Sequence, residues 1–160
     1  MNHARHFRLR EARDHDFPFA EALYLGTMEP LLSQLGDWDR EKFRERFRLQ
    51  FKARECQVIV VDGRDIGFVH VTESNADLKL AQIHIVDEFR GAGIGTNIVA
   101  DLVARAERGG QTVSLSAPRN NRAIRLYERL GFKIVRDNGE SIIDMRREHG
   151  TAGVQWIDGS

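Results

Sequence analysis

The sequence predicts an α+β fold, a mixed central β-sheet of about six to seven strands flanked by about four helices. Two β-rich runs, Cys56–Val61 and Ile66–Glu73, are separated by a short Asp-Gly-containing turn, which is typical of an antiparallel hairpin. From Leu78 to Ser116 the chain reads as strand, glycine-rich loop, amphipathic helix and strand. That order indicates a parallel crossover. Hairpins combined with one crossover require a mixed sheet.

Length and composition favour one ordinary globular domain. The chain has 160 residues, and its 24 Lys and Arg balance its 24 Asp and Glu, so bulk attraction to nucleic acid or to a membrane surface is not expected. No apolar run approaches the roughly 18 residues that span a bilayer. The N-terminus lacks the apolar core of a secretory signal, and the single Cys56 cannot form an internal disulfide. We therefore expect a cytoplasmic protein with one domain, 1–148, and a poorly ordered tail, 149–160.

The N-terminal third reads as one strand and then helices. Phe7–Ala12 alternates apolar and charged residues, as a strand does, and Asp14 is placed to cap a helix. The next apolar-periodic segment should be divided into two helices by Gly26 and Pro30. A second amphipathic helix follows, with three phenylalanines four residues apart on its inner face: Phe43, Phe47 and Phe51.

The remaining elements alternate strands and helices. After the hairpin, Leu78–Val86 reads as a strand, and 112–116 and two runs around Asn138-Gly139 read as further strands. A helix capped by Asn120 or Asn121 ends at Gly131. The helix after the glycine loop should bury one face, which consists of Ile94, Ile98, Val99, Leu102, Val103 and Ala106.

The glycine-rich loop, Arg90–Gly95, is the strongest local signal. Glycines permit positive φ angles and close backbone approach, and the following helix points unpaired N–H groups at whatever lies before it. Strand, loop and helix in this order therefore predict an anion site. No Lys-Ser/Thr pair follows Gly95, which excludes an NTPase phosphate loop, and the Gly-x-Gly-x-x-Gly fingerprint of dinucleotide-binding folds fails because Thr96 occupies its last position.

Two motifs together carry a family resemblance. Arg90-Gly91-Ala92-Gly93-Ile94-Gly95 resembles the Gln/Arg-x-x-Gly-x-Gly/Ala element of the GNAT superfamily, the acyl-CoA-dependent N-acetyltransferases. The later segment 120–132 is similar to the family's Asn-x-x-Ala-x-x-Leu-Tyr-x-x-x-Gly-Phe pattern, with matches at Asn120, Ala123, Leu126, Tyr127, Gly131 and Phe132. The likeness covers nearly the whole chain. Segments 28–47 and 78–96 further resemble a subgroup of small bacterial GNAT proteins whose acceptors are mostly unassigned.

The resemblance implies acetyl-CoA as the donor substrate and gives roles to named residues. Backbone N–H groups of the loop should hold the coenzyme A pyrophosphate, the strand around Ile83, His84 and Ile85 should pair with the pantetheine arm, and Asn120 should hydrogen-bond that arm. Family members splay this strand from the next one to open the slot. Tyr127 should donate a proton to the departing thiolate. The loop residues concerned are Arg90, Gly91, Ala92, Gly93, Ile94, Gly95 and Thr96.

The sequence does not identify the general base. The glutamate that many family members carry early in the strand before the loop is absent here, where the chain reads Leu78-Lys79-Leu80. His84, which shares a strand face with Gln82, is one candidate because the ordinary pKa of histidine suits proton traffic near neutrality. Glu21 and Glu29 are others, and an amine with a lowered pKa needs no dedicated base.

The expected activity is transfer of an acetyl group to a primary amine, by direct attack in a ternary complex. The acceptor is a small molecule or a peptide amine, no nucleic acid, membrane or metal is expected, and a homodimer is possible by resemblance. The alternative is a non-catalytic acyl-CoA-binding or sensing module on the same fold. Tyr127 and Asn120 favour the enzyme, and the missing glutamate favours the alternative.

Overall fold

The computed structural model describes residues 6–150, and the chain forms two compact units. The first consists of the residues up to Val71 together with Gln82–Gly95, and the second consists of Thr72–Ala81 and the residues from Thr96 onward. Most of the predicted tail, from residue 151, lies outside the described residues. The single-domain boundary at residue 148 stays a prediction.

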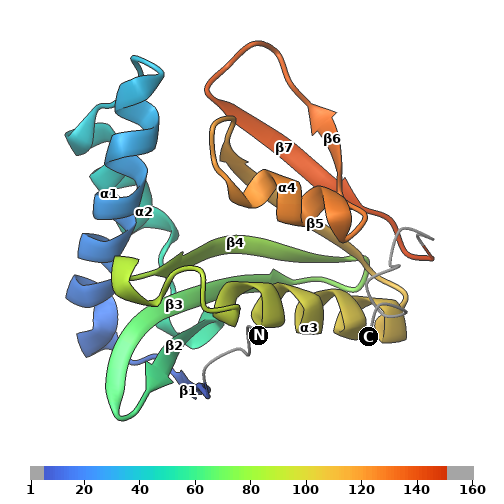
Figure 1. Ribbon diagram of the computed structural model, residues 1–160, viewed down its shortest axis with the longest axis horizontal. Coiled ribbons are helices and arrows are strands. Elements are labelled where there is room, and N and C mark those ends of the chain that lie inside the picture. Colours follow the sequence, from blue (N-terminus) through green and yellow to red (C-terminus); the bar gives the residue numbers. More distant parts are fainter. Residues whose placement is uncertain (1–5, 151–160) are drawn as a thin grey trace. The chain divides into compact units, whose positions relative to one another are not determined.

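The mixed sheet predicted from the sequence is present. Its seven strands are hydrogen-bonded in the order β1-β2-β3-β4-β5-β7-β6 (Figure 1). β4 and β5 are parallel, whereas β1–β2, β2–β3, β5–β7 and β6–β7 are antiparallel. The strands are β1 (Arg8–Glu11), β2 (Cys56–Val61), β3 (Arg64–Glu73), β4 (Asp77–Ile85), β5 (Thr112–Pro118), β6 (Lys133–Arg136) and β7 (Ile142–Arg147).

Two helices lie side by side in the first unit, α1 (Phe17–Gln34) and α2 (Arg40–Gln50) (Figure 1). The expected break at Gly26 and Pro30 is wrong, because α1 runs through both. Pro30 costs about 3 kcal/mol inside a helix, since it lacks an N–H and its ring presses on the carbonyl four residues earlier. Buried side chains before and after the proline, namely Tyr24, Leu25 and Leu32, anchor both halves of the helix and outweigh that cost.

The expected cap at Asp14 is also wrong. Asp14 begins a 3-10 turn that ends at Asp16, and α1 starts after it. The Asp16 carboxylate accepts from Arg10 Nη2 at 2.8 Å and from the backbone N–H of Arg13 at 2.8 Å. The hydrogen bonds from Arg10 hold the pKa of Asp16 at about 2. Asp16, not Asp14, therefore fixes the turn through which the chain enters α1.

The phenylalanine stripe of α2 packs as expected. Asp39 caps the helix by accepting from the Lys42 N–H at 3.1 Å, and Phe43 and Phe47 are buried. The Phe47 ring stacks on Tyr24 of α1, with centroids 4.7 Å apart. Phe51 follows the helix and is half-buried.

The second unit follows the predicted order, with most of α3 (Ile94–Gly109) and with α4 (Ala123–Arg129). All six apolar residues predicted for the inner face of α3 are buried. The N-cap residue of α4 is Arg122, and the Oδ1 of Asn121, one residue earlier, accepts from the Ala123 N–H at 2.8 Å. No helix among residues 6–150 is both long enough and apolar enough to cross a bilayer.

Candidate functional site

The glycine loop has the backbone geometry that the sequence predicts. It follows β4 and a 3-10 turn (Asp87–Phe89) and leads directly into α3. Gly91 and Gly93 have φ angles of 78° and 86°, a region that side chains with a Cβ rarely adopt. No atom lies within 4 Å of the position that a Cβ would take at Gly91. Open backbone before a helix N-terminus fits an anionic ligand such as a pyrophosphate.

The Arg90 side chain braces this loop. Its Nε donates to the carbonyl of Ile85 at 2.9 Å, and its Nη1 lies 2.6 Å from a carboxylate oxygen of Asp87. These contacts tie the first residue of the loop to the end of β4. The guanidinium is thus engaged within the protein, as is the backbone N–H of Arg90, which donates to the Asp87 carbonyl at 3.1 Å.

Gly67 of β3 lets the neighbouring end of β4 come unusually close. A Cβ at Gly67 would lie 2.4 Å from the His84 carbonyl oxygen and 3.2 Å from the Ile85 Cα. The N–H of Val86 also donates to the Ile66 carbonyl at 2.8 Å. The backbone of 83–85, predicted to pair with the donor, is thereby fixed from its β3 side.

The parallel ladder between β4 and β5 is short. It joins Asp77–Leu80 to Thr112–Leu115. The later residues of β4, Ala81–Ile85, take no part in this ladder. A strand end without this partner still has backbone N–H and C=O groups to offer, which is what pairing with a ligand requires.

His84 is held at both ring nitrogens. Its Nδ1 lies 2.8 Å from Thr27 Oγ1 of α1, and its Nε2 lies 2.7 Å from the Gln82 side chain. The prediction that His84 and Gln82 share one face of the strand is confirmed. The rings of Tyr24 and Phe68 flank the imidazole, with centroids 5.6 Å and 5.4 Å away.

The hydrogen bonds of the Thr27 hydroxyl favour a proton on Nδ1 of His84. Its oxygen lies 2.6 Å from the Leu23 carbonyl and 3.2 Å from the Tyr24 carbonyl, and both groups can only accept. The single hydroxyl hydrogen is therefore directed at the helix backbone. Oγ1 is left to accept from Nδ1, so a neutral His84 carries its proton there. The structure places Gln82 Oε1 2.7 Å from Nε2, so a proton on Nδ1 requires the Gln82 amide to be turned over, with its NH₂ donating to Nε2.

The pKa expected for His84 is wrong. Burial, with a smaller contribution from the Arg90 guanidinium, lowers the pKa of His84 to about 3. The imidazole is neutral near pH 7 and cannot hold a proton there. Its contact with Thr27 links β4 to α1.

Thr27→Val tests this tautomer. Valine keeps the shape of the side chain but leaves Nδ1–H without an acceptor, so the free energy of unfolding should fall by about 1–2 kcal/mol. The ¹⁵N shifts of the His84 ring should show Nδ1–H in the wild type and a mixture of tautomers in the variant. Thr27→Ser keeps the hydroxyl and should behave as the wild type. A wild-type ring protonated on Nε2 would contradict the assignment.

The two candidate carboxylates of α1 differ. Glu21 is half-buried and pairs with Arg48 Nε of α2 at 2.8 Å, so its charge is already used to join the two helices. Glu29 is exposed. Neither carboxylate is brought to His84 by a hydrogen bond among the described residues.

Asn120 and Tyr127 belong to the second unit, as does Thr96. Tyr127 of α4 is 5% exposed, and its ring packs against Phe132 with centroids 5.7 Å apart. Burial raises the pKa of Tyr127 to about 12, so the phenol keeps its proton at neutral pH. Within residues 6–150, no protein group accepts a hydrogen bond from its hydroxyl. Asn120 is half-buried and directly precedes Asn121.

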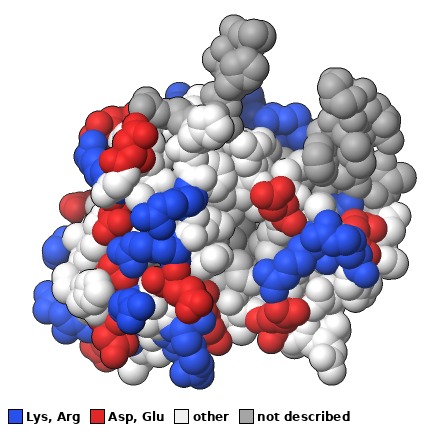
Figure 2. Space-filling model, turned by 90° about the horizontal axis from the view of Figure 1, so that it is seen from below, with Lys and Arg blue, Asp and Glu red and all other residues white. Residues whose placement is uncertain are grey.

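Among the described residues, no group of three or more His, Cys, Asp or Glu side chains could hold a metal ion. The face shown in Figure 2 carries Lys and Arg interspersed with Asp and Glu. That distribution agrees with the balanced composition of the chain.

Sequence reasoning missed Thr27 and Tyr24. They lie 57 and 60 positions before His84, and no spacing rule connects a helix to a strand over that distance. The available signal was weak. Thr27 is a polar residue on the side of α1 that also carries the buried Ala20 and Tyr24.

Comparison with known proteins identifies the family. The family model described as "Acetyltransferase (GNAT) domain" matches residues 52–134, more than half of the chain. Curated protein sequences give no match.

Solved structures share the fold at low sequence identity. PaiA N-acetyltransferase from Thermoplasma acidophilum, in complex with coenzyme A, is 16% identical with a TM-score of 0.68, over 90% of this chain and 99% of that one. The ribosomal-protein-S18-alanine N-acetyltransferase from Escherichia coli is 19% identical with a TM-score of 0.60, over 92% and 96% of the two chains. PH1933 from Pyrococcus horikoshii OT3 is 17% identical with a TM-score of 0.68, over 91% and 99%. With its family match and this fold, the chain belongs to the GNAT acetyltransferases.

Proposed function

We propose that the protein transfers the acetyl group of acetyl-CoA to a primary amine by direct attack in a ternary complex. The observation that carries this proposal is the loop Arg90–Gly95, where two glycines with positive φ lead into the N-terminus of α3 inside the segment that matches the family. PaiA N-acetyltransferase binds coenzyme A on the same fold.

The loop and β4 would hold the donor. Backbone N–H groups after Arg90, from Gly91 to Thr96, would bind the pyrophosphate, since the helix dipole and the N–H groups at a helix N-terminus both favour an anion there. The backbone of Ile83–Ile85 would pair with the pantetheine arm, and Asn120 would hydrogen-bond it. The donor supplies an activated acyl group as a thioester. The protein supplies orientation and an N–H dipole at the carbonyl.

Tyr127 would supply the proton that the departing thiolate needs. Its high pKa keeps the hydrogen on the phenol, and its packing against Phe132 fixes the ring. We assign no general base. His84 has too low a pKa, Glu21 is paired with Arg48, and an amine that binds in its neutral form can attack without one. Glu29 remains available to bind the amine through water.

Binding is tested first by thermal unfolding. Acetyl-CoA at about 100 times its Kd should raise the free energy of unfolding by about 2.7 kcal/mol and Tm by about 5–10 °C. The control is Gly93→Val in the loop, which should abolish most of the shift. An unchanged Tm at millimolar acetyl-CoA would remove the basis of the proposal.

Turnover separates the enzyme from a non-catalytic acyl-CoA-binding module. A panel of amines, including amino acids, polyamines and peptides with free N-termini, is assayed for release of free thiol. An enzyme turns over at least one class of amine. Ligand-dependent stabilisation with no thiol release from any amine would favour the sensing module.

A further inference from the structure

Helix α2 carries three exposed cations that form no ion pair with a carboxylate among the described residues: Arg40, Lys42 and Arg46. Lys42 and Arg46 are four residues apart, a spacing at which like charges repel on a helix. Two arginines of the same helix are paired: Arg44 with Glu41, and Arg48 with Glu21. Within the described part of the chain, ion pairs therefore neutralise two of the five cations of α2 and leave three, of which Lys42 and Arg46 form a positive pair one helical turn apart.

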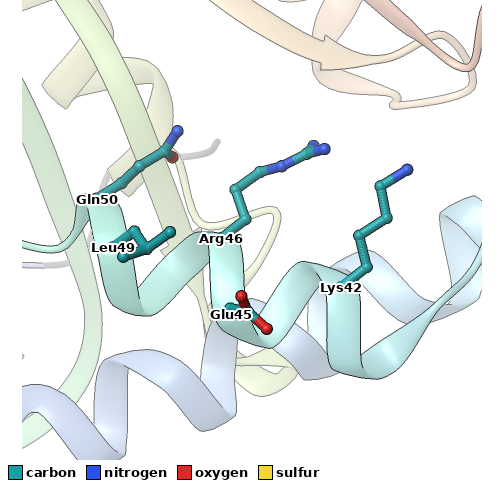
Figure 3. A pocket seen from close by; sticks show the side chains of 5 residues that line it. All are labelled: Lys42, Glu45, Arg46, Leu49 and Gln50. Carbon is teal, nitrogen blue, oxygen red and sulfur yellow. The ribbon is translucent and has the colours of Figure 1, made fainter.

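The open pair lines a hollow. Its volume is about 430 Å³, within the range of small-molecule sites. Figure 3 shows Lys42, Arg46 and Gln50 extending to the same side of α2, whereas Glu45 extends elsewhere. The residues that line it are Lys42, Glu45, Arg46, Leu49 and Gln50.

Packing holds the two cations in place. The Arg46 guanidinium lies 5.1 Å and the Lys42 ammonium 5.9 Å from the centroid of the buried Phe43 ring. Leu49 is 78% exposed and adds an apolar wall. Two donors fixed over an aromatic ring, beside an apolar surface and an amide, form a recognition site for an anion that is carried on a short carbon chain.

The positive charge of Arg46 acts on Tyr24, which packs against β4. Arg46 is close enough to Tyr24 to offset part of the increase in the pKa of the tyrosine that burial causes. The Tyr24 ring also packs against the imidazole of His84, and the two ring centroids are 5.6 Å apart. The charge of Arg46 thus acts on a tyrosine whose ring packs against His84 of the strand that would hold the donor.

We infer that the acceptor is a small amine that carries a carboxylate or phosphate group, which Lys42 and Arg46 bind while the amine reaches toward β4. This inference rests on the proposed acetyltransferase function and names its substrate class. A peptide substrate is the less favoured source of the anion, because the hollow has the size of a small molecule and both cations lie on one helical face.

Matched pairs of amines test the inference. β-Alanine is compared with β-alaninamide, and phosphoethanolamine with ethanolamine, so that each pair differs in the anion and the two pairs distinguish carboxylate from phosphate. For the wild type, kcat/KM should favour the charged member of at least one pair by tenfold or more. Arg46→Gln and Lys42→Gln should each lower that preference about fivefold, through KM, and the double variant should abolish it.

Arg44→Gln is the matched control. It removes one positive charge from the same helix at a position already paired with Glu41, and it should keep the preference. Equal turnover of charged and neutral amines by the wild type would overturn the inference, as would a preference that survives the double variant.

Calorimetry tests the anion site separately from the acetyltransferase activity, because it measures binding without turnover. β-Alanine and phosphoethanolamine are titrated into the wild type and into Arg46→Gln, each saturated with coenzyme A. Binding that the variant loses supports the anion site even if no thiol is released, in which case the acetyl transfer fails alone. Absence of binding to the wild type overturns the anion site, whatever other amines are turned over.

Discussion

Replacing Tyr127 by phenylalanine should lower kcat by about 100-fold and leave the KM for acetyl-CoA nearly unchanged. The substitution removes one oxygen and keeps the ring that packs against Phe132. A thiolate would then leave without a proton from the protein, so the loss falls on the transition state. Thiol release under saturating amine and acetyl-CoA measures kcat, and Tm should stay within a few degrees of the wild type.

Tyr24→Phe is the matched control for this result. Tyr24 is 4% exposed and Tyr127 is 5% exposed, so both substitutions delete a phenolic oxygen from a mostly buried ring. Tyr24 packs on Phe47 and His84, and its variant should keep kcat within about threefold of the wild type. If Tyr127→Phe is as fast as the wild type, or if both variants lose kcat equally, Tyr127 is not the proton donor.

Local patterns sufficed for most of the fold. The apolar face of α3 repeats at helical spacing, so its burial follows from periodicity, and all six predicted residues are buried. The hairpin between β2 and β3 turns at Asp62 and Gly63, both with positive φ. Asp-Gly is a residue pair that favours these backbone angles, so the turn could be predicted from the sequence. The loop at Gly91 and Gly93 is predictable for the same reason.

Features that depend on tertiary packing could not be predicted. Pro30 is a helix breaker by any local rule, and only the burial of Leu32 beyond it explains why α1 continues. The pKa of His84 follows from burial and from Arg90, which no sequence pattern places beside it. The open cations Lys42 and Arg46 read as an ordinary charged helix until the pairing of Arg44 and Arg48 is known.

Gly67→Ala should lower the free energy of unfolding by about 3 kcal/mol, because the added methyl group has no room. A Cβ there would lie 2.4 Å from the His84 carbonyl oxygen and 3.0 Å from the Ile59 Cδ1. The first of these atoms is backbone and cannot rotate away, so β3 and β4 must separate locally. The β4 segment that moves is the one proposed to pair with the donor, and the affinity for acetyl-CoA should fall in parallel.

Gly26→Ala makes the same chemical change but should alter the free energy of unfolding in the opposite direction. Gly26 is exposed inside α1, and no atom lies within 4 Å of the position of its Cβ. Alanine there should raise the free energy of unfolding by about 0.5–1 kcal/mol, because it restricts the unfolded chain and favours the helix. Urea unfolding measures both variants. A Gly67→Ala protein as stable as the wild type would show that β3 and β4 are not held as closely as the Gly67 geometry requires, and the fixed position assigned to the backbone of β4 would be lost with it.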